Sequence, residues 1–386
     1  MGQTVNFERA EFEQRYARLQ RALERDDLDA LLVTHEANFN YFTGFIVQQS
    51  WVSFSRNLIA LFPRKGAPVV LAPASLASEA RANGWIERVE PHDVVGAAPV
   101  ERLAELCRDL GLDPARIGAE LGYEQRLNLS YRDVERLKAL LPSAELVDAA
   151  PAIWRVRMRK SAAEIECLRR ACAITDATYE QIFAVVRAGM TERKIARRVG
   201  VLMLEHGADR TGWIMLTSGR GQYHRTLGTP RERAVQKGEM LWLDLSAIYN
   251  GYASDFCRAG IFGGPSAEQG ALQEKVYAAT MAGVRAVCAG VQARDVAGAC
   301  NAELSRQGLA PYDVGRLGHA LGLLSTEPPD VSVRDETILE PGMVLTIEPT
   351  VIRDDGIYEV EQDVVVTETG CEILSKSPPH LRVLNP

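Results

Sequence analysis

The stretch LDLSAIYNGYASDFCR, residues 243–258, predicts a β-hairpin. An apolar run precedes Asn250-Gly251, the residue pair that most favours a two-residue turn, because both central residues of that turn take positive φ. We therefore expect Tyr249 to face Tyr252 across the turn. This pairing sets the register of the whole hairpin.

Two carboxylates fall on one face of this predicted hairpin. In the expected register Asp244 faces Cys257, and Asp255 lies two residues nearer the turn on the same face, where diagonal neighbours are roughly 7–8 Å apart. An ionised carboxylate in apolar surroundings costs many kcal/mol unless a positive charge pairs with it. The pair therefore indicates a cation site, with Cys257 as a small core residue beside it.

A second stretch, LTIEPTVIRDDGIYEVEQDVVV (345–366), predicts a similar hairpin. A turn at the Asp-Gly pair 355–356 would place Glu348 opposite Asp363, with Glu361 two residues nearer the turn on the same face. A longer loop, or a bulge at the proline after Glu348, would change this register. Two hairpins with the same diagonal pair of acids indicate an internal structural repeat.

One histidine completes this set of ionisable groups. His319 lies in GRLGHALGLL (315–324), where Gly318 and Gly322 remove side-chain bulk and allow a close approach of the backbone. One imidazole and four carboxylates suit Mn, Co, Zn or Fe. Because four carboxylates overcharge a single ion, we expect two divalent ions about 3.5–4 Å apart, which generate a hydroxide near neutral pH.

The order Asp, Asp, His, Glu, Glu resembles the pita-bread metallohydrolases, which include methionine aminopeptidase, prolidase (Xaa-Pro dipeptidase), aminopeptidase P and the metal-free relative creatinase. The resemblance extends over nearly the whole chain. It rests on LDALLVTHEANFNYFTGF, RMRKSAAEIECLRRACAITDATY, AGMTERKIA, LDLSAIYNGYASDFCR, GRLGHALGLLSTEPP, LEPGMVLTIEPT and YEVEQDVVVTETG.

This resemblance implies an α+β protein of two domains that forms a homodimer. Residues 1–152 would form a creatinase-type α/β N-terminal domain, and residues 153–386 a pita-bread catalytic domain with a curved antiparallel sheet backed by helices. We take 151–154 as the linker. Residue periodicity in the first domain predicts helices near 7–25, 75–83 and 100–110, and strands at 29–34, 58–62, 69–71 and 116–119.

The resemblance also implies a role for each ligand. Asp244 would bind one ion, Asp255 and Glu361 would bridge both, and His319 with Glu348 would complete the other. Glu348 is also the expected proton shuttle, because it could hydrogen-bond to the attacking water while it remains a ligand.

A substrate-site histidine is expected near the scissile bond, and His224 in TSGRGQYHRTLGTP (217–230) is the candidate. Two positions depart from the proline-specific pattern: Thr326 replaces a histidine, and Glu359 replaces an arginine that can hold a substrate carboxylate. A glutamate there would repel a free carboxylate. Glu327 keeps its family position, as a hydrogen-bond support or as a catalytic group.

Composition indicates a large enzyme of the cytoplasm. The 386 residues are 46% hydrophobic and 25% charged, and the net charge of −7 is spread without a basic run, which argues against nucleic acid as a partner. No apolar stretch reaches membrane-spanning length, and the charged N-terminus does not resemble a signal peptide. Seven scattered cysteines without a CxxC pair indicate reduced thiols.

The resulting prediction is a dinuclear metal-dependent hydrolase of the Xaa-Pro peptidase type that cleaves a small peptide or amide. Three alternatives remain. The first is a creatinase-like or ectoine-hydrolase-like C–N hydrolase. The second is a dimethylsulfoniopropionate lyase, although that family carries an acid where this chain has Ser246. The third is a non-catalytic binding module, which would have no need to bury this much negative charge.

Overall fold

The computed structural model describes residues 7–46, 57–312 and 314–386, and the chain divides into two compact units between Arg157 and Met158. Residues 151–154, the expected linker, instead lie within helix α6 (Ala150–Arg157) of the first unit. Pro151 is accommodated because it lies in the first turn of the helix, where a backbone N–H has no intrahelical acceptor.

The first unit is an α/β unit built on one six-stranded sheet with the order β4-β3-β2-β1-β5-β6. β1 pairs antiparallel with β2 and parallel with β5. Its elements are α1 (Arg9–Arg25), β1 (Ala30–Val33), α2 (Glu36–Thr43), β2 (Ile59–Pro63), β3 (Val69–Pro73), α3 (Ala74–Asn83), β4 (Arg88–His92), α4 (Val100–Asp109), β5 (Arg116–Ala119), α5 (Tyr131–Leu140), β6 (Glu145–Asp148) and α6.

Burial explains why the expected elements of this unit form. Every residue of β1, β2 and β3 is buried, as in strands covered on both faces. Leu32, Leu103 and Ile117 belong to one apolar core, which α4 and α5 join. The helices and strands expected from periodicity are confirmed within a few residues at each end, whereas α2, β4, α5 and β6 had not been predicted.

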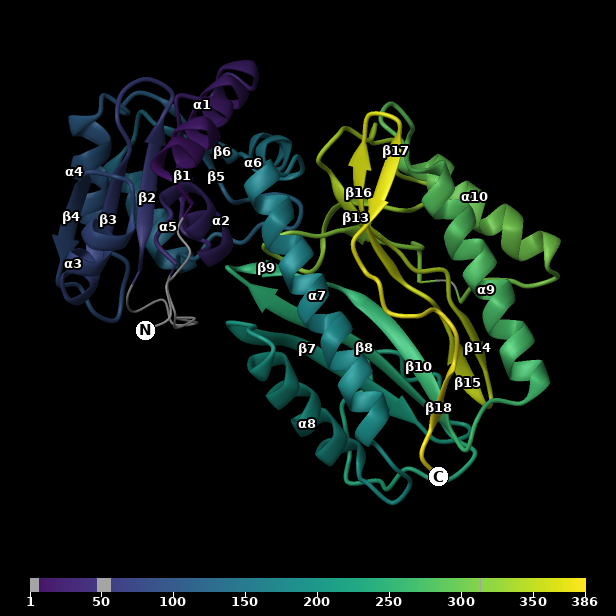
Figure 1. Ribbon diagram of the computed structural model, residues 1–386. Helices are drawn as coiled ribbons and strands as arrows, with labels where there is room; N and C mark the ends of the chain where they lie inside the picture. Colours follow the sequence, from purple (N-terminus) through teal and green to yellow (C-terminus); the bar gives the residue numbers. More distant parts are fainter. Residues whose placement is uncertain (1–6, 47–56, 313) are drawn as a thin grey trace. The chain divides into compact units, whose positions relative to one another are not determined.

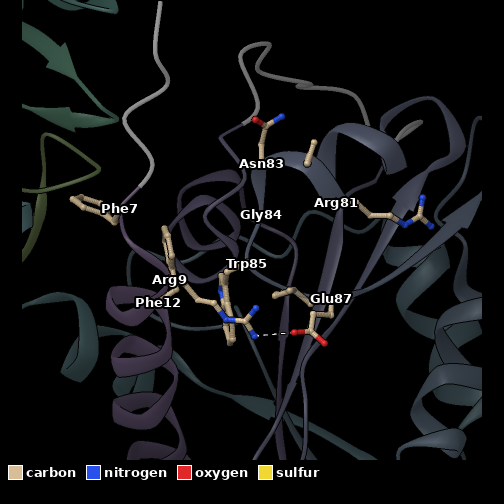
Figure 2. A pocket seen from close by; sticks show the side chains of 10 residues that line it. Phe7, Arg9, Phe12, Arg81, Asn83, Gly84, Trp85 and Glu87 are labelled. Carbon is tan, nitrogen blue, oxygen red and sulfur yellow. Dashed lines mark hydrogen bonds and ion pairs between the residues drawn. The ribbon is translucent and has the colours of Figure 1, made fainter.

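A surface hollow of about 350 Å³ lies in this unit, between the start of α1 and the segment after α3. Figure 2 shows Phe7, Phe12 and Trp85 around it, together with the ion pair between Arg9 and Glu87, at 2.9 Å. Both charged side chains are largely exposed, so this pair contributes little to stability.

The second unit contains two halves, each made of a helix pair and a five-stranded sheet, and the strands of these sheets pair antiparallel except for the parallel pair β10–β18 (Figure 1). α7 and α8 pack on the sheet β18-β10-β8-β7, to which β9 is added, and α9 and α10 accompany the sheet β12-β11-β13-β16-β17. The elements are α7 (Ala162–Val185), α8 (Glu192–Glu205), β7 (Arg210–Ser218), β8 (Met240–Tyr249), β9 (Tyr252–Ala253), β10 (Phe256–Phe262), α9 (Ala267–Ala286), α10 (Ala293–Arg306), β11 (His319–Ala320), β12 (Glu327–Asp330), β13 (Val344–Ile347), β14 (Val351–Arg353), β15 (Gly356–Tyr358), β16 (Gln362–Thr367), β17 (Gly370–Ile373) and β18 (Arg382–Leu384).

Local sequence signals start the long helices of this unit. Ser161 and Glu164 form a capping box at α7, and Ser266 with Gln269 forms another at α9, so backbone N–H groups at each N-terminus find acceptors. Across the described ranges, no helix has both the length and the apolar character needed to cross a membrane.

The first hairpin has the predicted register. Tyr249 pairs with Tyr252, and Asp244 pairs with Cys257. The two turn residues have φ of 50° and 84°, as the Asn-Gly pair predicts. Cys257 is fully buried in an apolar cluster, in agreement with its expected role as a core residue.

The register of the second hairpin differs from the predicted one. Arg353 pairs with Gly356, so the turn lies at 354–355, one residue earlier than expected. Thr346 therefore pairs with Asp363, and the ladder ends with residue 347 opposite residue 362. The Asp-Gly pair was a misleading signal for the turn. Gly356 instead packs closely against another strand, because a Cβ at this position would lie 2.5 Å from the Met240 side chain.

The shift changes how the two acids of the second hairpin are related. Glu348 follows β13 and Glu361 precedes β16, so in the continued register they lie directly opposite each other. The predicted diagonal placement of these two acids is therefore wrong. The first hairpin keeps its diagonal pair, and the two halves are similar rather than identical.

Candidate metal centre

Four strand ends and one strand interior supply the five predicted ligands. Asp244 lies within β8, and Asp255 directly precedes β10. His319 begins β11, Glu348 follows β13 and Glu361 precedes β16. Both five-stranded sheets of the second unit therefore contribute to one centre.

The distances among these side chains are short. Ligand atoms of Asp255, His319 and Glu361 all lie within 4.8 Å of one another, and all three residues are buried. Nε2 of His319 is 3.6 Å from Oδ2 of Asp255 and 3.5 Å from Oε1 of Glu348. The carboxyl group of Asp244 lies close enough to that of Asp255 for each to affect the pKa of the other. The structure therefore brings all five predicted ligands together.

His319 is oriented for metal binding through Nε2. Its Nδ1 lies 3.0 Å from the carbonyl oxygen of Ala320, which assigns the proton to Nδ1 and leaves the Nε2 lone pair facing the carboxylates. Burial, followed by the charge of Arg316, lowers the pKa of His319 to about 3, so the ring is neutral. Gly318 makes this placement possible: its φ is 146°, and a Cβ there would lie 2.1 Å from the carbonyl oxygen of Thr346.

The carboxylates of the first hairpin lack the partners that an ionised group needs. Oδ1 of Asp244 and Oδ2 of Asp255 are buried and accept no hydrogen bond from any described residue. Burial and then the charge of Glu359 raise the pKa of Asp244 to about 7. Burial, with Asp244 and Asp363 as the next causes, raises the pKa of Asp255 well above its usual value.

The acids of the second hairpin behave in the same way. Burial raises the pKa of Glu348, and the charges of Glu359 and Asp244 raise it further. The pKa of Glu361 is also raised by burial, with Asp255 and Glu348 as the next causes. The side chain of Glu348 remains 25% exposed, whereas those of Asp255 and His319 are almost fully buried.

This donor set fits divalent metal ions. Buried carboxylates that lie close together, with oxygens that accept no hydrogen bond, are unstable as anions on their own. Cations at the centre would bind those oxygens and restore the ionised forms. Four carboxylates and a neutral imidazole are ligands that Mn, Co, Fe and Zn accept.

Glu359, the residue in the expected arginine position, is buried beside the centre. Its Oε2 accepts a hydrogen bond of 3.0 Å from the indole of Trp242, and its Oε1 accepts one from the hydroxyl of Thr350. Burial raises the pKa of Glu359, although these hydrogen bonds oppose the rise. The centre therefore has a fifth acid where an arginine would place a positive charge.

The loop after His319 is held by a buried ion pair. Nζ of Lys160 lies 3.2 Å from Oε2 of Glu327, and both side chains are 1% exposed. Glu327 also accepts the N–H of Leu324, so a supporting role is the one its contacts favour. Gly322 packs against this pair, and a Cβ there would lie 2.9 Å from both side chains. Thr326 is half-buried immediately before β12.

His224 lies in a turn between β7 and β8 and is exposed, unlike the five buried or half-buried ligands. The neighbouring Tyr223 is 1% exposed, and its hydroxyl donates to the carbonyl oxygen of Met240. The loop is therefore anchored, while the imidazole itself remains open to solvent.

Two supporting residues were not recognised as such in the sequence. Arg258 is buried and donates to the carbonyl oxygens of Cys257 and Glu361, which ties the strand of one hairpin to a ligand of the other. Asp363 accepts the backbone N–H of Asp255 at 3.0 Å. An ionisable residue within an apolar strand was a signal for both, as it was for Asp244.

Each of the two units matches the model of a known protein family. The model of metallopeptidase family M24 matches residues 166–368, and that of the creatinase/prolidase N-terminal domain matches residues 15–159. The chain is 31% identical to an Xaa-Pro dipeptidase of Pyrococcus furiosus over 64% of this chain and 72% of that protein. It is 28% identical to an uncharacterized peptidase of Bacillus subtilis, over 92% and 96%.

A solved structure extends the likeness to the whole chain. The Xaa-Pro dipeptidase from Bacillus anthracis superimposes with a TM-score of 0.85 at 25% identity and covers 97% of this chain and 100% of that one. The expected fold class, a creatinase-type N-terminal domain before a pita-bread domain, is confirmed. This chain therefore belongs to metallopeptidase family M24 and is a metal-dependent hydrolase.

Proposed function

We propose that this chain is a dinuclear hydrolase of the Xaa-Pro peptidase type, with Asp244, Asp255, His319, Glu348 and Glu361 as its metal ligands. The observation that carries the proposal is the convergence of four acids and one neutral imidazole in a centre where buried carboxylate oxygens have no other partner. Two divalent ions balance the four negative charges. Manganese is among the metals that suit this set.

The ligands differ in the position that each would occupy. By the family resemblance, Asp255 and Glu361 would bridge both ions, with Asp244 on one side and His319 with Glu348 on the other. The short distances among the ligand atoms of Asp255, His319 and Glu361, all within 4.8 Å of one another, support this arrangement. When bound, the ions would activate a water molecule and polarise the scissile carbonyl. The protein fixes the donors in advance, so little reorganisation is needed during the reaction.

Glu348 is the residue we propose as the proton shuttle. It combines a side chain that solvent still reaches with a position 3.5 Å from His319, at the edge of the centre. A carboxylate there can take a proton from the attacking water and deliver it to the leaving nitrogen. His224 would then bind the substrate carbonyl from the anchored loop.

The substrate we propose is a peptide or small amide without a free carboxylate beside the scissile bond. Glu359 places a buried carboxyl group, and no positive charge, where an arginine would bind such a carboxylate. Thr326, which replaces a histidine of the proline-specific pattern, leaves a C–N hydrolase of a small non-peptide substrate as the second candidate. Composition and the family resemblance support a cytoplasmic homodimer.

A substrate panel tests this proposal. Manganese-loaded protein would be assayed with Xaa-Pro dipeptides, longer Xaa-Pro peptides, creatine, ectoine and dimethylsulfoniopropionate. We expect longer Xaa-Pro peptides to be cleaved with a higher kcat/KM than the dipeptides. In Glu359→Gln, the ratio of these two kcat/KM values should be closer to one. Acrylate release from dimethylsulfoniopropionate, or no amide cleavage by metal-loaded protein, would contradict the proposal.

A further inference from the structure

Asp363 is a fully buried carboxylate beside the metal centre that the reaction itself does not require. Its Oδ2 accepts the backbone N–H of Asp255 at 3.0 Å and lies 3.2 Å from the thiol sulfur of Cys172. Asp363 belongs to β16, whereas Asp255 precedes β10 in the other sheet. One side chain therefore connects the two halves of the centre.

The position of Asp363 in its strand links it to two ligands at once. It lies two residues after Glu361, so the two side chains leave the backbone on the same side. One strand thus supplies Glu361 directly and holds Asp255 through Asp363. Ligand atoms of Asp255 and Glu361 lie within 4.8 Å of each other. The hydrogen bond from the Asp255 N–H to Asp363 fixes the backbone from which the Asp255 carboxylate extends.

The other contacts of Asp363 do not explain a buried carboxylate. Its backbone N–H donates to the hydroxyl of Ser375, independently of the side chain. Its Oδ1 and the hydroxyl of its cross-strand partner Thr346 are both buried and have no hydrogen-bond partner in the described part of the chain. The hydrogen bonds of the side chain are therefore those that Oδ2 accepts from Asp255 and Cys172.

We propose that Asp363 is a positioning residue of the metal centre, which holds the main chain of Asp255 so that its carboxylate can bridge two ions. This inference rests on the proposed dinuclear function. It assigns to Asp363 an effect on metal affinity that acts through Asp255, without contact with the substrate.

Two substitutions separate this role from a general contribution to folding. Asp363→Ala removes the acceptor of the Asp255 N–H. Asp363→Asn keeps an oxygen for that N–H and for Cys172 in a side chain of nearly the same volume. We therefore expect Asp363→Ala to weaken Mn²⁺ binding by roughly 10–100-fold, as loss of an outer hydrogen bond to a ligand does, and Asp363→Asn to restore it to within about threefold.

The measurement is calorimetric titration of Mn²⁺ into chelator-treated, metal-free full-length protein. Cleavage of a longer Xaa-Pro peptide is followed in parallel, where Asp363→Ala should regain kcat at excess Mn²⁺ without a change in KM. Glu192→Ala is the matched control, because Glu192 is also fully buried and accepts from Ser218 and Arg231. It should lower stability and leave Mn²⁺ affinity unchanged.

Unchanged Mn²⁺ affinity in Asp363→Ala would overturn the inference. If that variant does not fold, Asp363→Asn carries the test, and a tenfold loss of affinity in it would also overturn the inference. Wild-type protein that binds no Mn²⁺ would overturn the proposed function, and the role of Asp363 with it. Normal wild-type binding with an unaffected Asp363→Ala would overturn the role of Asp363 alone.

Discussion

In chelator-treated protein, the buried carboxyl of Asp244 should make the free energy of unfolding fall as pH rises. Comparison of wild type with Asp244→Asn isolates the contribution of this one group. The pKa of Asp244 is raised from 3.8 in the unfolded chain to about 7 in the folded one. The folded state therefore holds a proton that the unfolded state has lost. Its stabilising contribution is complete below the unfolded pKa and is lost as pH rises through the folded pKa.

The expected size follows from these two values. Between about pH 6 and pH 8 the unfolded carboxyl stays ionised while the folded one loses its proton, which lowers the free energy of unfolding by on the order of 1 kcal/mol. His319 has the opposite sign, because its pKa falls from 6.5 to about 3 on folding. Its contribution is shared by wild type and Asp244→Asn, so it cancels in their difference.

The assay is urea unfolding of chelator-treated protein at the two pH values. The free energy of unfolding of Asp244→Asn relative to wild type should increase by on the order of 1 kcal/mol from pH 6 to pH 8. In wild type refilled with Mn²⁺ the loss should disappear, since metal binding keeps the carboxylates ionised and strengthens with pH. A difference between the two proteins that stays constant or shrinks would refute the reasoning.

Three further substitutions test other parts of the structure. Glu348→Gln should lower kcat by ~10²–10⁴-fold with a smaller change in KM, measured at verified metal content, because an amide cannot carry the proton; a normal kcat would contradict the shuttle role. Lys160→Met leaves Glu327 buried without its cation and should cost about 3–5 kcal/mol in urea unfolding, while addition of Glu327→Gln should recover much of it; equal losses in both variants would refute the pairing. Gly318→Ala should cost more than about 2 kcal/mol and weaken Mn²⁺ binding, because its Cβ would meet the carbonyl of Thr346; a neutral substitution would contradict the close approach.

The first hairpin and the convergence of the candidate ligands could be predicted from the sequence, since each rests on a strong local signal. The Asn-Gly turn fixes a register, and Asp244 stands out because an acid within an apolar strand needs a partner. Gly318 likewise indicated close packing beside His319, which the structure confirms. These features depend on short segments and on charge burial, both of which are visible in sequence.

The second hairpin could not be predicted, because a tertiary contact determined its register. The glycine at 356 packs against Met240, a residue far away in sequence, and so does not mark the turn. The link from Asp363 to Asp255 likewise joins strands of two different sheets. No local pattern contains that information.

Metal content per chain tests the central claim most directly. Elemental analysis of the purified, metal-loaded wild type and of Asp255→Asn would be combined with peptide cleavage by the same samples. We predict close to two transition-metal ions per wild-type chain, and loss of both metal and activity in Asp255→Asn, since its carboxylate lies among the other ligands. A wild type that remains metal-free with unchanged stability, or an Asp255→Asn variant that keeps two ions and full activity, would contradict the proposed centre.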